Sequence, residues 1–247
     1  MFSFNNKKGR LLLFSTSIIF NIILCFLIVY IGYAKTNFFK RVGARLNICH
    51  IEDKDRPDYW CIQGWNNTIE KLNLNVDIVF FGNSITRGSS FHNYFKDKSV
   101  CNLGYPGDTL DGMLLRVKQI KDLHPKKVFI MAGINGLHWQ SQDVFKEKYT
   151  KLLSLTTNAV PNSEIYLQSI LPVNHKMKPG VASSNKIIEA NKIIEELAKD
   201  YHCTYIDLYS IYAKDGEMPI ELTRDGVHLF PESYEIWAKK IQPFIEQ

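Results

Sequence analysis

The chain has 247 residues, of which 45% are apolar and 22% charged. This composition is typical of a globular protein and excludes disordered, collagen-like and low-complexity chains. The formal charge of +5 is uneven, because residues 1–45 hold seven Lys or Arg and no Asp or Glu. Residues 46–247 hold 23 basic and 25 acidic side chains and therefore carry a charge of −2. Since a phosphate backbone is bound by clustered positive side chains, we expect no nucleic-acid partner.

An apolar run without a charged residue extends from Leu11 to Ala34. At about 1.5 Å per residue, a helix of this length crosses a hydrocarbon core of roughly 30 Å. The run is longer than the apolar part of a signal peptide, which has about 7–15 residues. We therefore predict that residues 1–34 form a single-pass membrane anchor. A cleavable signal peptide is the alternative, with Gly32 and Ala34 as small residues before the cut.

Basic residues flank both ends of this run, so their distribution determines its orientation only weakly. We expect the N-terminus inside and the catalytic body on the extracytoplasmic side, periplasmic or extracellular. The five cysteines include no CxxC pair, and the sequence contains no metal, dinucleotide or phosphate-loop motif. We therefore expect neither a metal nor another cofactor. In an exported body, Cys49 and Cys61 would form a disulfide or remain free thiols.

Beyond the anchor, we expect residues 35–75 to be an irregular connector and residues 76–247 to form one regular domain. Apolar runs rich in β-branched and aromatic residues predict five strands, at Val76–Phe81, Val100–Leu103, Lys127–Ala132, Glu164–Ile170 and Thr204–Leu208. Helical patterns follow near 91–97, 109–122, 142–158, 184–200 and 231–246. Strands that alternate with helices and are apolar on both faces indicate a parallel sheet covered on both sides. The prediction is a three-layer α/β domain.

In such a sheet, functional residues gather in the loops at the carboxyl ends of the strands. Ser84 follows Gly82 and Asn83 after the first predicted strand, where a serine is either an exposed nucleophile or a helix cap. The second loop contains Gly104 and Gly107. These glycines permit close backbone approach with an exposed N–H, although an ordinary turn before a helix would look the same.

The third and fourth loops carry polar side chains. Asn135 lies between two glycines after the third strand, where its amide could donate to a developing anion or serve only as a turn residue. Asp225 and His228 are three residues apart in one loop. They could face one cleft or form a surface pair.

In this order and spacing, the four loops resemble the four sequence blocks of the SGNH (GDSL) hydrolase family. The blocks are FGNSIT, NLGYPGDT, GIN and DGVH, at 81–86, 102–109, 133–135 and 225–228. The resemblance covers about residues 76–246 and is nearest to the platelet-activating-factor acetylhydrolase-like and bacterial acylesterase branch. It implies a flavodoxin-like sheet.

The resemblance also implies the roles of the site residues. Ser84 would be the nucleophile, His228 the general base and Asp225 the residue that orients the imidazole. The oxyanion hole would consist of the backbone N–H groups of Ser84 and Gly107 and the side-chain amide of Asn135.

Two positions depart from the family pattern. The Asp that usually precedes the serine is Asn83, and the Asp that often follows the third-block asparagine is Gly136. We expect the first loop to keep its shape, because Asn and Asp are similar in size, and the support of Asn135 to be looser.

The resulting prediction is a membrane-anchored serine ester hydrolase that removes short acyl groups, acetyl above all, from a glycan or another small polar ester. No connecting loop carries a long apolar insertion that could form a deep acyl tunnel. The alternatives are a lysophospholipase or thioesterase acting on lipid acyl esters, a transacylase, and a non-catalytic binding domain. Trp139 could line the substrate pocket or be a core or rim aromatic residue.

Overall fold

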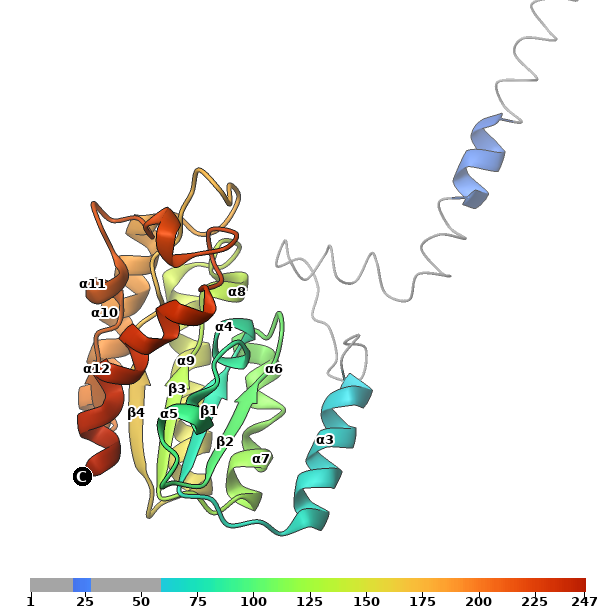
Figure 1. Cartoon of the computed structure of the whole chain (residues 1–247). Helices are drawn as coiled ribbons and strands as arrows, with labels where there is room; N and C mark the ends of the chain where they lie inside the picture. The colour runs from blue at the N-terminus through green and yellow to red at the C-terminus, as the bar shows by residue number, and fades with distance from the viewer. Residues whose placement is uncertain (1–19, 28–58) are drawn as a thin grey trace, which may run out of the picture. The chain divides into compact units, whose positions relative to one another are not determined.

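The computed structural model describes residues 20–27 and 59–247 (Figure 1). The chain divides into two compact units, Met1–Tyr59 and Trp60–Gln247. In the first unit, residues 20–27 are helical and exposed. Among the described residues, no helix combines the length and apolar character needed to cross a membrane. The rest of the predicted anchor and Cys49 of the predicted disulfide lie outside the described residues.

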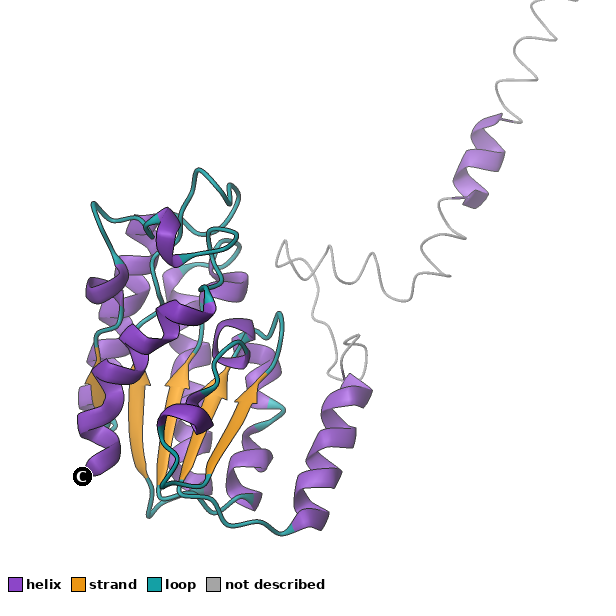
Figure 2. Cartoon of the chain, viewed as in Figure 1, coloured by secondary structure: helices purple, strands orange, loops and turns teal. Residues whose placement is uncertain are grey.

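The second unit is built on a parallel sheet of five strands in the order β2-β1-β3-β4-β5 (Figure 2). The strands are β1 (Ile78–Gly82), β2 (Val100–Gly104), β3 (Lys127–Met131), β4 (Glu164–Gln168) and β5 (Thr204–Ile206). Strands β1 and β3 are buried along their whole length, which explains why their sequences are apolar on both faces. The predicted five-stranded parallel sheet is confirmed.

Helices connect the strands and cover the sheet (Figure 1). In chain order they are α3 (Tyr59–Leu72), α4 (Ser84–Arg87), α5 (Phe91–Tyr94), α6 (Leu110–Leu114), α7 (Val117–Asp122), α8 (Ile134–Leu137), α9 (Gln142–Ala159), α10 (Ser184–Asp200), α11 (Tyr209–Tyr212) and α12 (Tyr234–Glu246). Two short 3₁₀ helices, η2 (Ile220–Leu222) and η3 (Pro231–Ser233), precede α12.

Aromatic residues form the core on the face covered by α5 and α12. Phe80, Phe129 and Tyr166 occupy paired positions on three neighbouring strands. Their ring centroids lie 5.1 Å and 4.5 Å apart. Phe91 of α5 stacks on Phe80 at 4.2 Å, and Trp237 of α12 contacts Phe91 edge-on at 5.3 Å. Such ring pairs add specific geometry to the burial of apolar area.

Four helices pack against one another on the opposite face, with α9 in contact with α6, α7 and α10. Helix α9 begins at the N-cap Ser141, whose side chain accepts a hydrogen bond from the Val144 N–H. Its buried residues recur at helical spacing: Phe145, Tyr149, Leu152, Leu153 and Thr156. This stripe is the sequence pattern that predicted a helix at 142–158.

Two of the predicted segments have a different structure. Residues 59–72, expected to be irregular, form α3, which buries Ile62, Asn66 and Ile69 at helical spacing. The polar Asn66 at one of these positions conceals the apolar period. The helix expected over 109–122 is two helices, because Leu115 and Arg116 separate α6 from α7.

Candidate active site

Ser84 lies at the carboxyl end of β1, where it is the first residue of α4. The helix is capped by Asn83, whose Oδ1 accepts a hydrogen bond of 2.9 Å from the Ile85 N–H. Ser84 is therefore not the cap, and its hydroxyl is not required for the turn. Because N–H groups in the first turn of a helix lack intrahelical acceptors, the Ser84 N–H is available to another acceptor.

The structure brings the predicted nucleophile, base and orienting residue into one chain of hydrogen bonds. Ser84 Oγ lies 2.8 Å from Nε2 of His228, a residue 144 positions later in the sequence. His228 Nδ1 lies 2.7 Å from Oδ2 of Asp225. The side chains of His228 and Asp225 are 27% and 39% exposed. The group is therefore open to the surface.

Asp225 also organises its own loop, since its Oδ1 accepts hydrogen bonds from the backbone N–H groups of Val227 (3.0 Å) and His228 (2.8 Å). Burial alone would raise the pKa of Asp225, but the hydrogen bonds from His228 and Val227 outweigh it and lower the pKa from 3.8 to about 2. The carboxylate is thus ionised at neutral pH and can only accept. Nδ1 of His228 must then carry a proton, which leaves the Nε2 lone pair facing the Ser84 hydroxyl.

Two residues that the sequence did not reveal hold this loop in place, Thr223 through its side chain and Asn174 through its backbone. Thr223 is fully buried; its hydroxyl donates to the His228 carbonyl (2.8 Å) and accepts from the Gly226 N–H (3.0 Å). The backbone N–H of Asn174 donates to the Gly226 carbonyl at 2.8 Å. Gly226 has φ +92°, and a Cβ there would lie 2.8 Å from the Asn174 carbonyl oxygen. The only signal in the sequence was the position of Thr223, two residues before Asp225.

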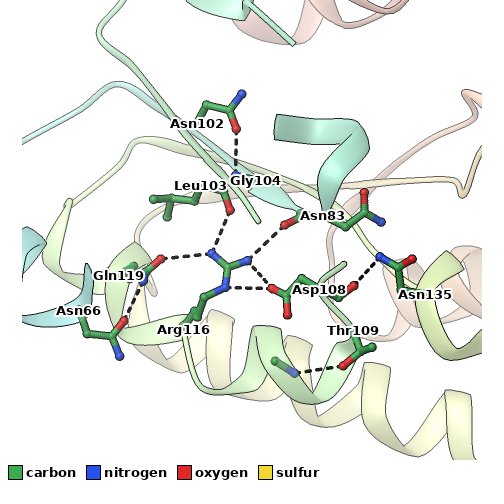
Figure 3. Close-up of polar contacts among 12 residues, drawn as sticks. Asn66, Asn83, Asn102, Leu103, Gly104, Asp108, Thr109, Arg116, Gln119 and Asn135 are labelled. Carbon is green, nitrogen blue, oxygen red and sulfur yellow. Dashed lines mark hydrogen bonds and ion pairs between the residues drawn. The ribbon is translucent and has the colours of Figure 1, made fainter. Parts of the chain in front are cut away.

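The predicted oxyanion-hole residues Gly107 and Asn135 come from two loops that meet where Asn135 contacts Asp108, the residue after Gly107 (Figure 3). Gly107 is exposed, with φ +73°. Asn135 Nδ2 donates a hydrogen bond of 2.9 Å to the backbone carbonyl of Asp108. Because a carbonyl requires a donor, this contact fixes the orientation of the amide and leaves its second N–H for another acceptor. Asn135 interrupts α8 with non-helical backbone angles, φ −74° and ψ 119°.

Three further positions named in the sequence analysis can be placed. Gly104 is the last residue of β2 and not part of a turn. A Cβ there would lie 2.2 Å from the backbone nitrogen of Arg87. Gly136, where the family often has Asp, has φ +91°. Trp139 is 56% exposed, so it is not a core residue.

If the Asn135 amide meets charge that exists only in the tetrahedral state, Asn135→Ala should lower kcat by about 10²–10³ with a smaller change in KM. Steady-state kinetics on an aryl acetate would measure both constants. A change confined to KM would mean that Asn135 binds substrate in its ground state and is not part of an oxyanion hole.

The sequence profile of the GDSL-like Lipase/Acylhydrolase family matches residues 80–236, which include the Ser84 loop and the Asp225–His228 loop. The chain belongs to this family. The resemblance noted in the sequence is therefore confirmed: the matched residues form a GDSL-like lipase/acylhydrolase domain.

Solved structures share the fold. A GDSL-like lipase from Bacteroides thetaiotaomicron is 25% identical, with a TM-score of 0.66 over 75% of this chain and 97% of that one. A Streptococcus pneumoniae protein provisionally named a platelet activating factor is 23% identical, with a TM-score of 0.67 over 74% and 92%. A Geobacillus acetyl-xylooligosaccharide esterase is 17% identical, with a TM-score of 0.57 over 72% and 97%.

Among curated proteins, the N-acylneuraminate cytidylyltransferase of Streptococcus agalactiae is 21% identical over 178 residues. The match covers 71% of this chain and 40% of that protein. The chain thus spans well under half the length of the curated relatives it matches.

Proposed function

We propose that this protein is a carboxylic ester hydrolase that removes short acyl groups, acetyl above all, from a glycan or another small polar ester. The observation that carries the proposal is the hydrogen-bonded series Ser84–His228–Asp225. Ser84 Oγ lies 2.8 Å from His228 Nε2, which would take its proton, and His228 Nδ1 lies 2.7 Å from Asp225 Oδ2, which would orient the imidazole. The half-exposed site and the names of two relatives support the substrate class. One is an acetyl-xylooligosaccharide esterase, whose name gives an acetylated sugar as substrate. The other is an N-acylneuraminate cytidylyltransferase, whose name gives a sugar acid with an amide-linked acyl group and therefore supports a sugar substrate only.

The proposed reaction proceeds in two halves. His228 Nε2 takes the proton from the Ser84 hydroxyl as Oγ attacks the acyl carbonyl carbon, and the carbonyl oxygen becomes an oxyanion. The N–H groups of Ser84 and Gly107 and the amide of Asn135 would donate to that oxygen. The intermediate expels the alcohol, which receives the proton from His228, and leaves an acyl-serine. Water then attacks the acyl-serine with His228 as base, which releases the carboxylic acid and restores Ser84.

The proposed preference for short acyl groups predicts a clear chain-length profile. Only 17 residues separate Ser84 from Asn102, and the triad is partly exposed, so we expect a shallow acyl site. Each CH₂ left in water forfeits about 0.8 kcal/mol of binding free energy. On p-nitrophenyl esters, kcat/KM should be highest at about two to four carbons and fall for longer chains.

An activity maximum at about ten carbons or more, measured below the aggregation threshold of the substrate, would contradict this profile. It would favour the lysophospholipase or thioesterase alternative, in which a bilayer presents the long chain to an open cleft.

The natural substrate is best sought by measuring acyl release from acylated glycans and lipids, with wild type compared with Ser84→Ala. Release of acetate from a glycan by the wild type alone would support the proposal. A fluorophosphonate probe that labels the wild type but not Ser84→Ala would separate a hydrolase from a non-catalytic binding domain. Analysis of products in the presence of a polyol would detect transacylation.

We further propose that residues 1–34 anchor the protein in a membrane, with the catalytic domain on the extracytoplasmic side. The length and lack of charge of residues 11–34 support the proposal. The full chain should remain with membranes after carbonate extraction, whereas a truncated protein that begins near Lys35 should be recovered in the supernatant with its esterase activity. Protease added from outside should digest the body. Digestion only from the cytoplasmic side would reverse the orientation.

A further inference from the structure

A buried arginine, Arg116, contacts Asp108, and Asn135 contacts Asp108 from the other side (Figure 3). Arg116 is 2% exposed and forms an ion pair with Asp108, which is 1% exposed. Nε and Nη2 of the guanidinium donate to the same carboxylate oxygen, Oδ2, at 2.9 Å and 2.6 Å.

The other donors of Arg116 bind the backbone at the ends of two strands. Nη2 donates to the Gly82 carbonyl at the end of β1, at 3.2 Å, and Nη1 donates to the Leu103 carbonyl in β2, at 2.9 Å. One rigid guanidinium thus contacts β1, β2 and the turn after β2. A lysine ammonium could not reproduce this, because it lacks the planar fork of five donors.

The guanidinium is itself held from two sides. Nη1 also donates to Gln119 Oε1 at 3.2 Å, and Gln119 Nε2 donates to Asn66 Oδ1 at 2.8 Å. The carbon at its centre lies 4.7 Å from the centroid of the Phe81 ring and 5.6 Å from that of Tyr105. Arg116 therefore has little freedom to move.

Two of the contacts of Arg116 lie close in sequence to a predicted oxyanion donor. Gly82 precedes Ser84 by two residues, and Asp108 directly follows Gly107. The backbone carbonyl of Asp108 is also the acceptor that orients the Asn135 amide. A buried ion pair adds little net stability compared with apolar residues of similar volume, because both charges must be desolvated. Stability alone therefore does not account for this arrangement.

We infer that Arg116 is a positioning residue of the oxyanion hole. Its guanidinium sets the distances among the Ser84 N–H, the Gly107 N–H and the Asn135 amide before substrate arrives. Donors fixed in advance need no reorganisation when negative charge develops on the carbonyl oxygen. The inference rests on the proposed function, since the hole matters only if an acyl ester is attacked at Ser84.

The test is Arg116→Lys, assayed on p-nitrophenyl acetate beside the wild type. We expect kcat to fall about 10- to 100-fold, with KM changed less than about threefold, because the donors act on the transition state. The midpoint of the kcat/KM pH profile should not move, because the Ser84–His228–Asp225 series is not in contact with the guanidinium. In combination with Asn135→Ala, the loss should be smaller than the product of the two single losses, because part of the effect of Arg116 acts through Asn135.

Leu152→Ala is the matched control, since this fully buried residue of α9 contributes to the core and not to the site. It should lower Tm while kcat per folded molecule stays at the wild-type value. If Arg116→Lys does not fold, Asp108→Asn serves as the second variant, because it removes the carboxylate but keeps the carbonyl that binds Asn135. The same loss in kcat and the same non-additivity are expected.

Three results would overturn the inference. They are wild-type kcat per folded molecule in the substituted protein, losses that multiply with Asn135→Ala, and a pH profile that shifts with the substitution. A wild type without ester hydrolysis would refute the proposed function and, with it, the inference. An active wild type with an unaffected Arg116→Lys variant would refute the inference alone.

Discussion

Ser84→Ala and His228→Ala should each lower kcat by roughly 10⁴–10⁶, and the double variant should be no slower than the slower single variant. A serine hydroxyl is a weak nucleophile unless a base takes its proton, and the 2.8 Å contact between Ser84 Oγ and His228 Nε2 provides such a base. Once either partner is removed, the other has no remaining function in the chemical step. Initial rates on an aryl acetate at a fixed pH would measure all three variants.

Substitution of another histidine provides the control for this experiment. His92 is exposed on α5, and His92→Ala should retain wild-type kcat. A double variant about a thousandfold slower than either single variant would show that Ser84 and His228 act independently. The assignment of one catalytic unit would then be wrong.

The central strands could be predicted because they are apolar on both faces, as in the run VDIVFF at 76–81, which covers β1 except for Gly82. The long helices α9 and α10 could be predicted because their buried residues recur at helical spacing. Helices α4, α8 and α11 have four residues each, too few to show any period. Their positions depend on the turns at the ends of the strands, which hydrophobic periodicity does not identify.

Ser84, Asn135, Asp225 and His228 could be proposed as site residues from the sequence because their side chains can carry the chemistry and follow predicted strands or share one loop. The residues that hold their loops in place could not be predicted. Thr223 and Asn174 hold the Asp225–His228 loop through backbone groups of its members. Arg116 reaches the carbonyls of Gly82 and Leu103 across the fold. Almost every residue type offers the same backbone N–H and carbonyl groups, so a contact to a backbone atom does not restrict the residue type of the partner. A single sequence therefore cannot reveal such contacts.

Asp225→Asn should lower kcat by about 10⁴, because an amide cannot stabilise the imidazolium and can hold His228 in the wrong tautomer. Stability provides an independent measurement. Since folding lowers the pKa of Asp225 from 3.8 to about 2, its contribution to stability is fully present above pH 3.8 and is lost as the pH falls through about 2. The Tm difference between wild type and Asp225→Asn should therefore shrink as the pH falls from about 4 toward about 2. Wild-type kcat in this variant would show that Asp225 does not orient His228. A Tm difference that grows as the pH falls from about 4 to about 2 would contradict the hydrogen bonds on which its low pKa depends.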